Sequence, residues 1–244
     1  AETIAGNVVL SLSVAQACDV AGVRLGTVSS GCIYTGAMIR LTNGAWAVED
    51  RLNEPLISEL LEKRSAKIRG FSENEEPNFT FQHNNCSFYS GTKAVAEQAL
   101  RAFPDFYIWR IRIPFDEFAG PRNYLSKLQR YAKIYQNWNS LTNRGDFARA
   151  CLLFSSGRLS GGIYNMTNPG YCSTQQVVKM IKDHLKPGWN PDFWIGDDDF
   201  YRFGAATPRS NCILDTSKQK NSGVHLRPIH EALSQSLAEW RPAQ

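Results

Sequence analysis

The sequence predicts an α/β fold with a parallel sheet and crossover helices. Apolar residues recur at helical spacing from 5 to 21 and again from 87 to 103. Each helical stretch is followed by a short run rich in β-branched or aromatic residues, VRLGTVSS at 23–30 and FYIWRIRI at 106–113. Helix followed by strand therefore occurs twice in succession, which is typical of parallel strands joined by helices.

The composition is that of a folded protein with one large domain or two small ones. The chain has 244 residues, 43% of them apolar and 20% charged, and its formal net charge is +4. Basic residues are spread along the chain, which suits an anionic small molecule better than a nucleic acid. No eighteen consecutive residues are apolar, and the N-terminus lacks the basic segment of a secretory signal. We therefore expect a cytoplasmic protein with no membrane partner.

Cysteine and histidine spacing gives no sign of a metal site. The sequence has no CxxC pair of the kind found in zinc sites and redox motifs, so reduced thiols and no metal are expected. The cysteines occur singly, at positions 18, 32, 86, 151, 172 and 212. The histidines, also without ligand-like spacing, lie at positions 83, 184, 225 and 230.

The rest of the chain shows shorter patterns. Residues 35–86 are irregular and polar, and they predict a long loop with one short helix, PLISELLEKRSAKI. Ser173, with Gln176 three residues later, is typical of a capping box that starts the helix VVKMIKDHL. Further helices are predicted at 121–135, 146–156 and 229–240, and a strand at 161–166.

Tyr89 and Lys93 are the clearest chemical signal. Their spacing of four places both side chains on one face of the predicted helix, where an ammonium can lower the pKa of a phenol from about 10. The spacing alone has little specificity, because any helix with a surface Tyr and Lys shows it. Its context adds weight: Ser29 and Ser30 end the preceding strand, at the edge where α/β sheets place their chemistry.

Six motifs in order resemble the nucleotide-sugar branch of the extended short-chain dehydrogenases/reductases. They are SGCIY, FYSGTKA, RIRIP, PRN, NMTNPG and ATPRSNCILD, and they cover nearly the whole chain. Within that branch they are most similar to bifunctional UDP- or dTDP-4-keto-6-deoxyglucose 3,5-epimerase/4-reductases, the rhamnose synthases. The dTDP-4-dehydrorhamnose reductases and GDP-fucose synthases are related.

The resemblance implies a Rossmann-like domain at 1–114 and about 145–168, and a small α/β substrate-binding domain at about 115–144 and 169–244. A complete member begins with a strand and a G-x-x-G-x-x-G turn that holds the cofactor pyrophosphate. No such segment occurs in this sequence, so the first strands of the usual fold are expected to be missing. The segment is absent either from the natural protein or only from this chain.

The resemblance also implies roles for four residues. Tyr89 would protonate the substrate's C4 oxygen as hydride arrives from NADPH or NADH, and Lys93 would hold the nicotinamide ribose. Ser30 would hydrogen-bond the same substrate oxygen, and Ser29 would contact the cofactor.

Cys32 and Lys127 are the candidates for epimerisation. The Ser30-x-Cys32 spacing is similar to that of GDP-fucose synthases, where the cysteine is an acid/base, and a thiolate can remove protons next to a ketone. Lys127 would serve the opposite face of the sugar. The alternatives are that Cys32 is a small buried core residue and that Lys127 is a solvated helix residue.

The resemblance also implies that the nucleotide sugar is contacted by Arg122, Asn123, Arg209 and Asn211. An arginine fork suits a pyrophosphate. The expected partner is thus a UDP- or dTDP-sugar, and homodimers are common in the resembling families. The implied function is reduction coupled to 3,5-epimerisation, giving UDP- or dTDP-L-rhamnose. The alternatives are a reductase without epimerase activity and a non-catalytic binding protein of the same fold.

Overall fold

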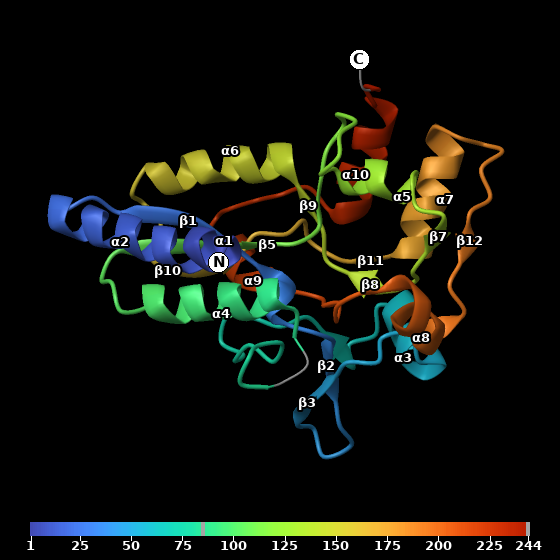
Figure 1. The fold of residues 1–244 in the computed structure, drawn as a ribbon, viewed down its shortest axis with the longest axis horizontal. Helices are drawn as coiled ribbons and strands as arrows, with labels where there is room; N and C mark the ends of the chain where they lie inside the picture. Colours follow the sequence, from blue (N-terminus) through green and yellow to red (C-terminus); the bar gives the residue numbers. More distant parts are fainter. Residues whose placement is uncertain (84–85, 243–244) are drawn as a thin grey trace.

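A central parallel sheet organises the computed structural model, which describes residues 1–83 and 86–242 (Figure 1). Its strands are β1 (Leu25–Ser30), β5 (Phe106–Ile111) and β10 (Gly162–Asn165), in the order β1-β5-β10. All are parallel, and β1 pairs with β5 from Leu25 opposite Phe106 to Ser30 opposite Ile111. The predicted α/β fold with a parallel sheet is confirmed.

Helices cover both faces of this sheet. A continuous helical run of α1 (Glu2–Ile4), η1 (Ala5–Val9) and α2 (Leu10–Ala21) leads into β1, and Gly22 ends it with φ of +65°. This run and α4 (Phe88–Leu100) share a core cluster with Leu25, Ile108 and Ile163. Helix α6 (Arg144–Ser155) packs on the other face, where Phe154 contacts Tyr107 and Tyr164 (Figure 1).

The region expected to be a loop with one helix contains a small antiparallel sheet. Strands β2 (Ala37–Arg40), β3 (Trp46–Glu49) and β4 (Ile68–Arg69) pair in the order β3-β2-β4, beside helix α3 (Pro55–Glu62). The expectation of a loop was therefore wrong. The missed signal was Asn43-Gly44, a typical hairpin dipeptide, which here turns the chain between β2 and β3.

We expect Gly36→Ala to lower the free energy of unfolding by about 3 kcal/mol. Gly36 has φ of +92°, and a Cβ there would lie 2.2 Å from the carbonyl oxygen of Glu49. Gly44→Ala is the matched control, because Gly44 has φ of +84° but open space around it. Denaturant unfolding should show a loss of about 1 kcal/mol for the control. Equal losses would show that crowding against Glu49 is not the cause.

The second half of the chain adds short strands and helices around its own core. Its helices are α5 (Tyr124–Leu128), α7 (Thr174–His184), α8 (Gly196–Asp199), η3 (Phe200–Gly204), α9 (Ser217–Asn221) and α10 (Ile229–Ala238). Its two-residue strands pair as β6 (Pro114–Phe115) with β9 (Thr142–Asn143), β7 (Lys133–Ile134) with β12 (Asp192–Phe193), and β8 (Trp138–Asn139) with β11 (Cys172–Ser173).

Two predictions in this half can be compared directly. The capping box is confirmed: the Ser173 hydroxyl accepts from the Gln176 amide, and the Gln176 side chain accepts from the Ser173 amide. The helix expected at 121–135 was too long, since only Tyr124–Leu128 is helical and residues 133–134 pair with β12.

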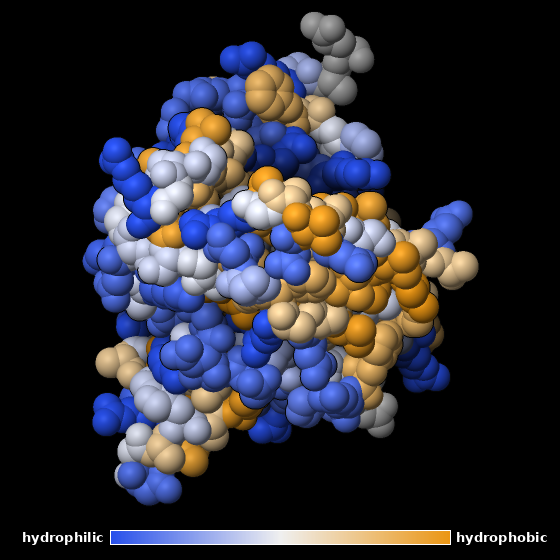
Figure 2. All heavy atoms as spheres, turned by 90° about the vertical axis from the view of Figure 1, so that its left-hand side faces the viewer, coloured by the Kyte–Doolittle hydropathy of each residue, from blue (hydrophilic) through white to orange (hydrophobic). Residues whose placement is uncertain are grey.

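The N-terminal helical run leaves much of its apolar surface uncovered. Its exposed apolar side chains are Ile4, Val9, Leu10, Val14 and Val20. Figure 2 shows apolar side chains gathered in a band on this side of the molecule. By length and composition alone, with a mean hydropathy of 1.5, Glu2–Ala21 is also long and apolar enough to cross a membrane. Core helices of soluble proteins and signal sequences meet the same criterion.

Candidate active site

Ser30 is held at the carboxyl end of β1 by the turn that follows it. The residues after it form the short helix η2 (Gly31–Ile33), and the Cys32 amide donates a 3.2 Å hydrogen bond to Ser30 Oγ. Ser30 lies beside Ile111 at the end of β5. The hydroxyl is therefore placed where the two central strands of a parallel sheet end together.

Helix α4 brings Tyr89 and Lys93 to the same edge. It begins at Ser87, whose hydroxyl accepts from the Ser90 amide, and it packs against both β1 and η2. Lys93 Nζ lies 3.5 Å from the carbonyl oxygen of Val28 and 6.0 Å from the centre of the Tyr89 ring. The structure thus places Ser30, Tyr89 and Lys93 in one group.

Desolvation by the surrounding protein dominates the electrostatics of this pair, although Tyr89 is itself 47% exposed. It raises the pKa of Tyr89 above its usual value, with Cys32 adding to the rise, while the hydroxyl of Ser30 and the charge of Arg112 act in the opposite direction. Burial lowers the pKa of Lys93. The net shift of the Tyr89 pKa is therefore upward, opposite in direction to the lowering that the spacing with Lys93 predicts. A phenol with a raised pKa stays protonated at neutral pH, which suits a proton donor.

Arg112 belongs to this edge and was missed in the sequence. It follows β5, is 7% exposed, and donates from Nη2 to Asn139 Oδ1 at 2.7 Å and to the backbone oxygen of Ser210. Asn139 in turn donates to Asn211 Oδ1 at 3.1 Å. These contacts tie the ATPRSN segment to the end of β5. The available signal was the second arginine of RIRIP, a charged residue directly after a largely apolar strand.

The other predicted site residues are placed as follows. The Ser29 hydroxyl points into the core, where it donates to Glu97 Oε2 at 3.2 Å. Asn123 is 1% exposed and caps α5, with its amide donating to the backbone oxygens of Asp116 and Phe118. Two arginines, Arg122 and Arg209, are exposed at the surface.

The two residues assigned to epimerisation differ in position. Cys32 is 7% exposed in η2, close enough to influence the pKa values of both Tyr89 and Lys93. Lys127 is half-buried on α5, which packs against β6. Within residues 1–83 and 86–242, no hydrogen bond or ion pair joins the Lys127 side chain to Cys32 or Tyr89.

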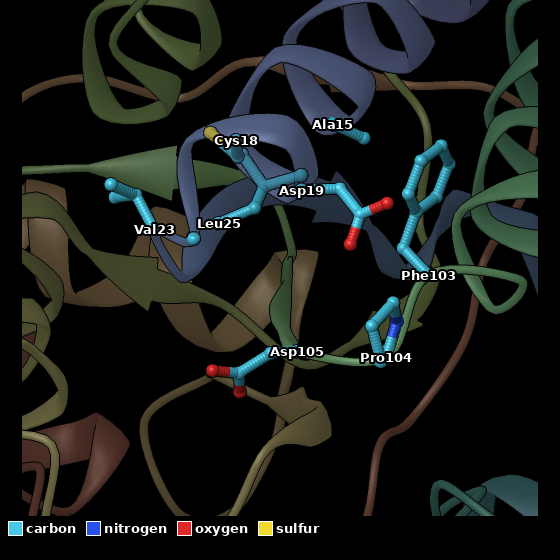
Figure 3. Close-up of a pocket in the computed structure, with 9 residues that line it drawn as sticks. Ala15, Cys18, Asp19, Val23, Leu25, Phe103, Pro104 and Asp105 are labelled. Carbon is cyan, nitrogen blue, oxygen red and sulfur yellow. The ribbon is translucent and has the colours of Figure 1, made fainter.

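A cavity of about 190 Å³ lies at the opposite end of the sheet. Figure 3 shows the carboxylate of Asp19, near the end of α2, pointing toward the side of the cavity that Phe103 and Pro104 line. These residues precede β1 and β5, whereas Ser30 is the last residue of β1 and Arg112 follows β5. This cavity is therefore separate from the candidate site.

The parallel sheet, with a serine at its carboxyl edge and a tyrosine and lysine four residues apart on the adjoining helix, defines a Rossmann-like α/β protein of the short-chain dehydrogenase/reductase type. No protein-family model matches the chain. The chain is 30% identical over 239 residues to a bifunctional dTDP-4-dehydrorhamnose 3,5-epimerase/dTDP-4-dehydrorhamnose reductase of Arabidopsis thaliana. The aligned region covers 98% of this chain and 69% of that protein.

Two solved structures share the fold. The L780 UDP-rhamnose synthase of Acanthamoeba polyphaga mimivirus matches with a TM-score of 0.75 and 23% identity, over 96% of this chain and 70% of that one. A dTDP-4-dehydrorhamnose reductase of Bacillus anthracis in complex with NADP matches with a TM-score of 0.66 and 18% identity, over the same shares. The chain belongs to the dTDP-4-dehydrorhamnose reductase and rhamnose synthase family.

Proposed function

We propose that this protein is an oxidoreductase that reduces the C4 ketone of a nucleotide-linked 4-keto-6-deoxyhexose, coupled to 3,5-epimerisation, giving UDP- or dTDP-L-rhamnose. The observation that carries the proposal is the grouping of Ser30, Tyr89 and Lys93 at one sheet edge. A chain that served only as a binding protein would not need a proton donor, a cation and a hydroxyl in this arrangement.

The reduction follows from this group. The Ser30 hydroxyl, at the end of β1, donates to the ketone oxygen and fixes the carbonyl. A nicotinamide held by Lys93 and Tyr89 would supply the hydride for C4. The oxygen of the opening carbonyl takes the proton of the Tyr89 hydroxyl, which leaves an alcohol and a tyrosinate that solvent reprotonates. The adjoining Lys93 ammonium stabilises that tyrosinate.

The site fits the nicotinamide ribose. Lys93 Nζ makes one contact within the described residues, at 3.5 Å to Val28, so its other hydrogens are available to ribose hydroxyls. We assign the ribose to Lys93 and Tyr89. The Ser29 hydroxyl is engaged by Glu97, so Ser29 would meet the cofactor through its backbone. The Bacillus anthracis neighbour is a complex with NADP, which supports NADPH as the reductant.

Epimerisation uses a second pair in this proposal. The Cys32 thiolate removes the proton at C3 or C5, next to the C4 ketone, and the electron pair moves onto the carbonyl oxygen as an enolate. Lys127 returns a proton to the opposite face of the carbon. The support is the position of Cys32 close to Tyr89 and the bifunctional activity for which the Arabidopsis relative is named.

The nucleotide sugar is assigned to the part of the chain that includes 115–144 and 169–244. The supporting observation is that these two segments share one core, including Phe115, Leu125, Val177 and Leu233. The exposed arginines Arg122 and Arg209 lie in this part and are free to meet phosphates. Asn211 is held through Asn139 and Arg112 next to the reacting edge.

The reduction rate is expected to stay flat with pH from about 6 to 9, and to fall only above that range. The proton donor is active in its protonated form, which persists below its pKa, and the pKa of Tyr89 is raised from 10.0. The pKa of Lys93 is lowered, so its charge is lost at a lower pH than that of an unperturbed lysine, and this loss also lowers the rate as the pH rises. Stopped-flow measurement of kcat against pH tests this. A fall between pH 6 and 8 would point to a different acid.

The experiment that tests the proposed function is NADPH oxidation with UDP- and dTDP-4-keto-6-deoxyglucose offered separately, followed by analysis of the product sugar. Turnover of either substrate to the rhamnose nucleotide supports the proposal. The substrate that reacts then shows whether the protein uses a UDP- or a dTDP-sugar. Turnover to a 6-deoxyhexose that keeps the C3 and C5 configuration shows a reductase without epimerase activity. No turnover with either substrate refutes both.

A further inference from the structure

Helix α4 buries one carboxylate that connects it to both central strands. Glu97 is 2% exposed and lies against Arg110 of β5, which is 0% exposed. Arg110 Nε donates to Glu97 Oε1 at 3.2 Å and to Oε2 at 3.0 Å, and Arg110 Nη2 donates to Oε1 as well. On the neighbouring strand, Ser29 Oγ donates to Glu97 Oε2 at 3.2 Å. One side chain therefore joins α4, β5 and β1.

These contacts lie directly behind the candidate catalytic residues. Tyr89, Lys93 and Glu97 are four residues apart on α4, so they follow one side of the helix. At 1.5 Å per residue, Glu97 lies about 12 Å along the helix from Tyr89, too far to touch the reacting atoms. Ser29 directly precedes Ser30 on β1. The Ser29 contact thus holds β1, which carries Ser30, against α4, which carries Tyr89 and Lys93, while the Arg110 contacts hold α4 on β5.

The buried ion pair between Glu97 and Arg110 lies among other charged groups, and its hydrogen bonds are better suited to fixing the position of α4 than to adding stability alone. The Arg110 guanidinium lies 5.1 Å from the ring centre of Tyr34, and Arg101 Nη2 approaches Glu97 Oε1 at 3.5 Å. Glu73, whose pKa burial raises, also faces Arg110. Within the described residues Arg110 Nη1 has no hydrogen-bond partner. Replacing a buried ion pair by apolar groups is often neutral or favourable for stability, whereas its directed hydrogen bonds hold a geometry that apolar groups do not.

We propose that Glu97, Arg110 and Ser29 form a positioning clamp that seats α4 on β1 and β5, so that Tyr89 and Lys93 face Ser30. Its kinetic consequence rests on the proposed reductase function, while its structural consequence for Tyr89 does not. The side chains of the clamp residues are hydrogen-bonded to one another within the core. They are positioning residues.

The mildest test is Ser29→Ala, which removes only the link to β1. We expect kcat for reduction to fall about 10-fold, with the KM for the nucleotide sugar unchanged, because small displacements of a reacting group lower rates steeply. Ser236→Ala is the matched control: Ser236 is also a buried serine, 3% exposed, and its hydroxyl accepts from Asn143 on the other side of the molecule. Equal effects of the two substitutions would overturn the proposal.

Charge removal tests the centre of the clamp. Glu97→Gln should lower kcat about 100-fold with KM little changed. Because that variant leaves Arg110 buried without its partner charge, the double variant Glu97→Leu/Arg110→Met provides a second route to a folded protein. The proposal expects the double variant to fold and still lose about 100-fold in kcat. A folded double variant with the kcat of the unmodified protein would overturn it.

A spectroscopic readout separates this inference from the proposed function. In protein labelled with ¹³Cζ tyrosine, the Tyr89 resonance, assigned through Tyr89→Phe, is titrated with pH. The clamp variants should move the pKa of Tyr89 by at least about 0.5 unit, and Ser236→Ala should not. If the unmodified protein reduces neither ketone, the proposed function fails while this titration still decides the clamp. An unmoved Tyr89 resonance in every clamp variant would refute the clamp.

Discussion

Tyr89→Phe is expected to lower kcat for ketone reduction about 10³-fold, the range typical of losing a general acid. The phenyl ring fills the same space at the start of α4, so the fold and the position of Lys93 over the ring should persist. Only the hydroxyl proton next to Ser30 is lost. Single-turnover reduction measures the loss, and calorimetric binding of the nucleotide sugar should show a Kd within about twofold of the unmodified protein.

Tyr131→Phe is the matched control for this substitution. Tyr131 is 52% exposed, close to the 47% of Tyr89, and lies in the segment after α5. Its substitution should leave kcat unchanged. If Tyr89→Phe kept most of its activity, or if both substitutions lowered kcat alike, Tyr89 would not be the proton donor.

Cys32→Ser is expected to reduce solvent deuterium incorporation at C3 and C5 by at least about 10²-fold. A serine hydroxyl keeps the shape of the thiol but hardly ionises near neutral pH, so it cannot remove the proton next to the ketone. Reduction of a sugar that is already epimerised should persist, because Ser30 and Tyr89 remain in place. Deuterium at each carbon is read by NMR of the product.

Cys86→Ser controls for general loss of a thiol near the site. Cys86 is half-buried, and burial raises its pKa, with Cys32 close enough to add to the rise. Exchange should continue in this variant. If exchange is unchanged in Cys32→Ser, Cys32 is a core residue and does not take part in epimerisation.

The elements that bring the site together were predictable because their signals are local. Helical and strand periodicity identified α2, β1, α4 and β5 in order, and the Ser173 capping box was read from two residues. The ordered motifs identified the family. From these alone, Ser30, Tyr89 and Lys93 could be assigned to one edge of a parallel sheet, and the structure groups them there.

What the sequence could not supply depends on contacts between distant residues. The β3-β2-β4 sheet pairs short strands that have little pattern of their own, so Asn43-Gly44 was its main signal. The direction of the Tyr89 pKa shift depends on burial, which spacing does not reveal. Glu97 and Arg110 are 13 residues apart in the sequence, and they form an ion pair only because α4 packs on β5. Arg112 likewise depends on Asn139 and Ser210.

Two neighbouring serines at the end of β1, Ser29 and Ser30, have different roles in the proposed site. Successive side chains of a strand point to opposite faces, so Ser29 and Ser30 at the end of β1 have different surroundings. The Ser29 hydroxyl contacts the buried Glu97, while Ser30 Oγ accepts from the Cys32 amide at the start of η2. One serine thereby fixes the helix that carries Tyr89, and the next is left to meet the substrate.

The most direct measurement of the central claim is deuterium transfer from [4,4-²H₂]NADPH to the sugar. The protein is incubated with the UDP- or dTDP-4-keto sugar, and the product is analysed by mass spectrometry and NMR. Our account predicts one deuterium at C4 of the product, formed by the unmodified protein and Tyr131→Phe but about 10³-fold more slowly by Tyr89→Phe. A product without deuterium at C4, or equal transfer by Tyr89→Phe, would contradict it.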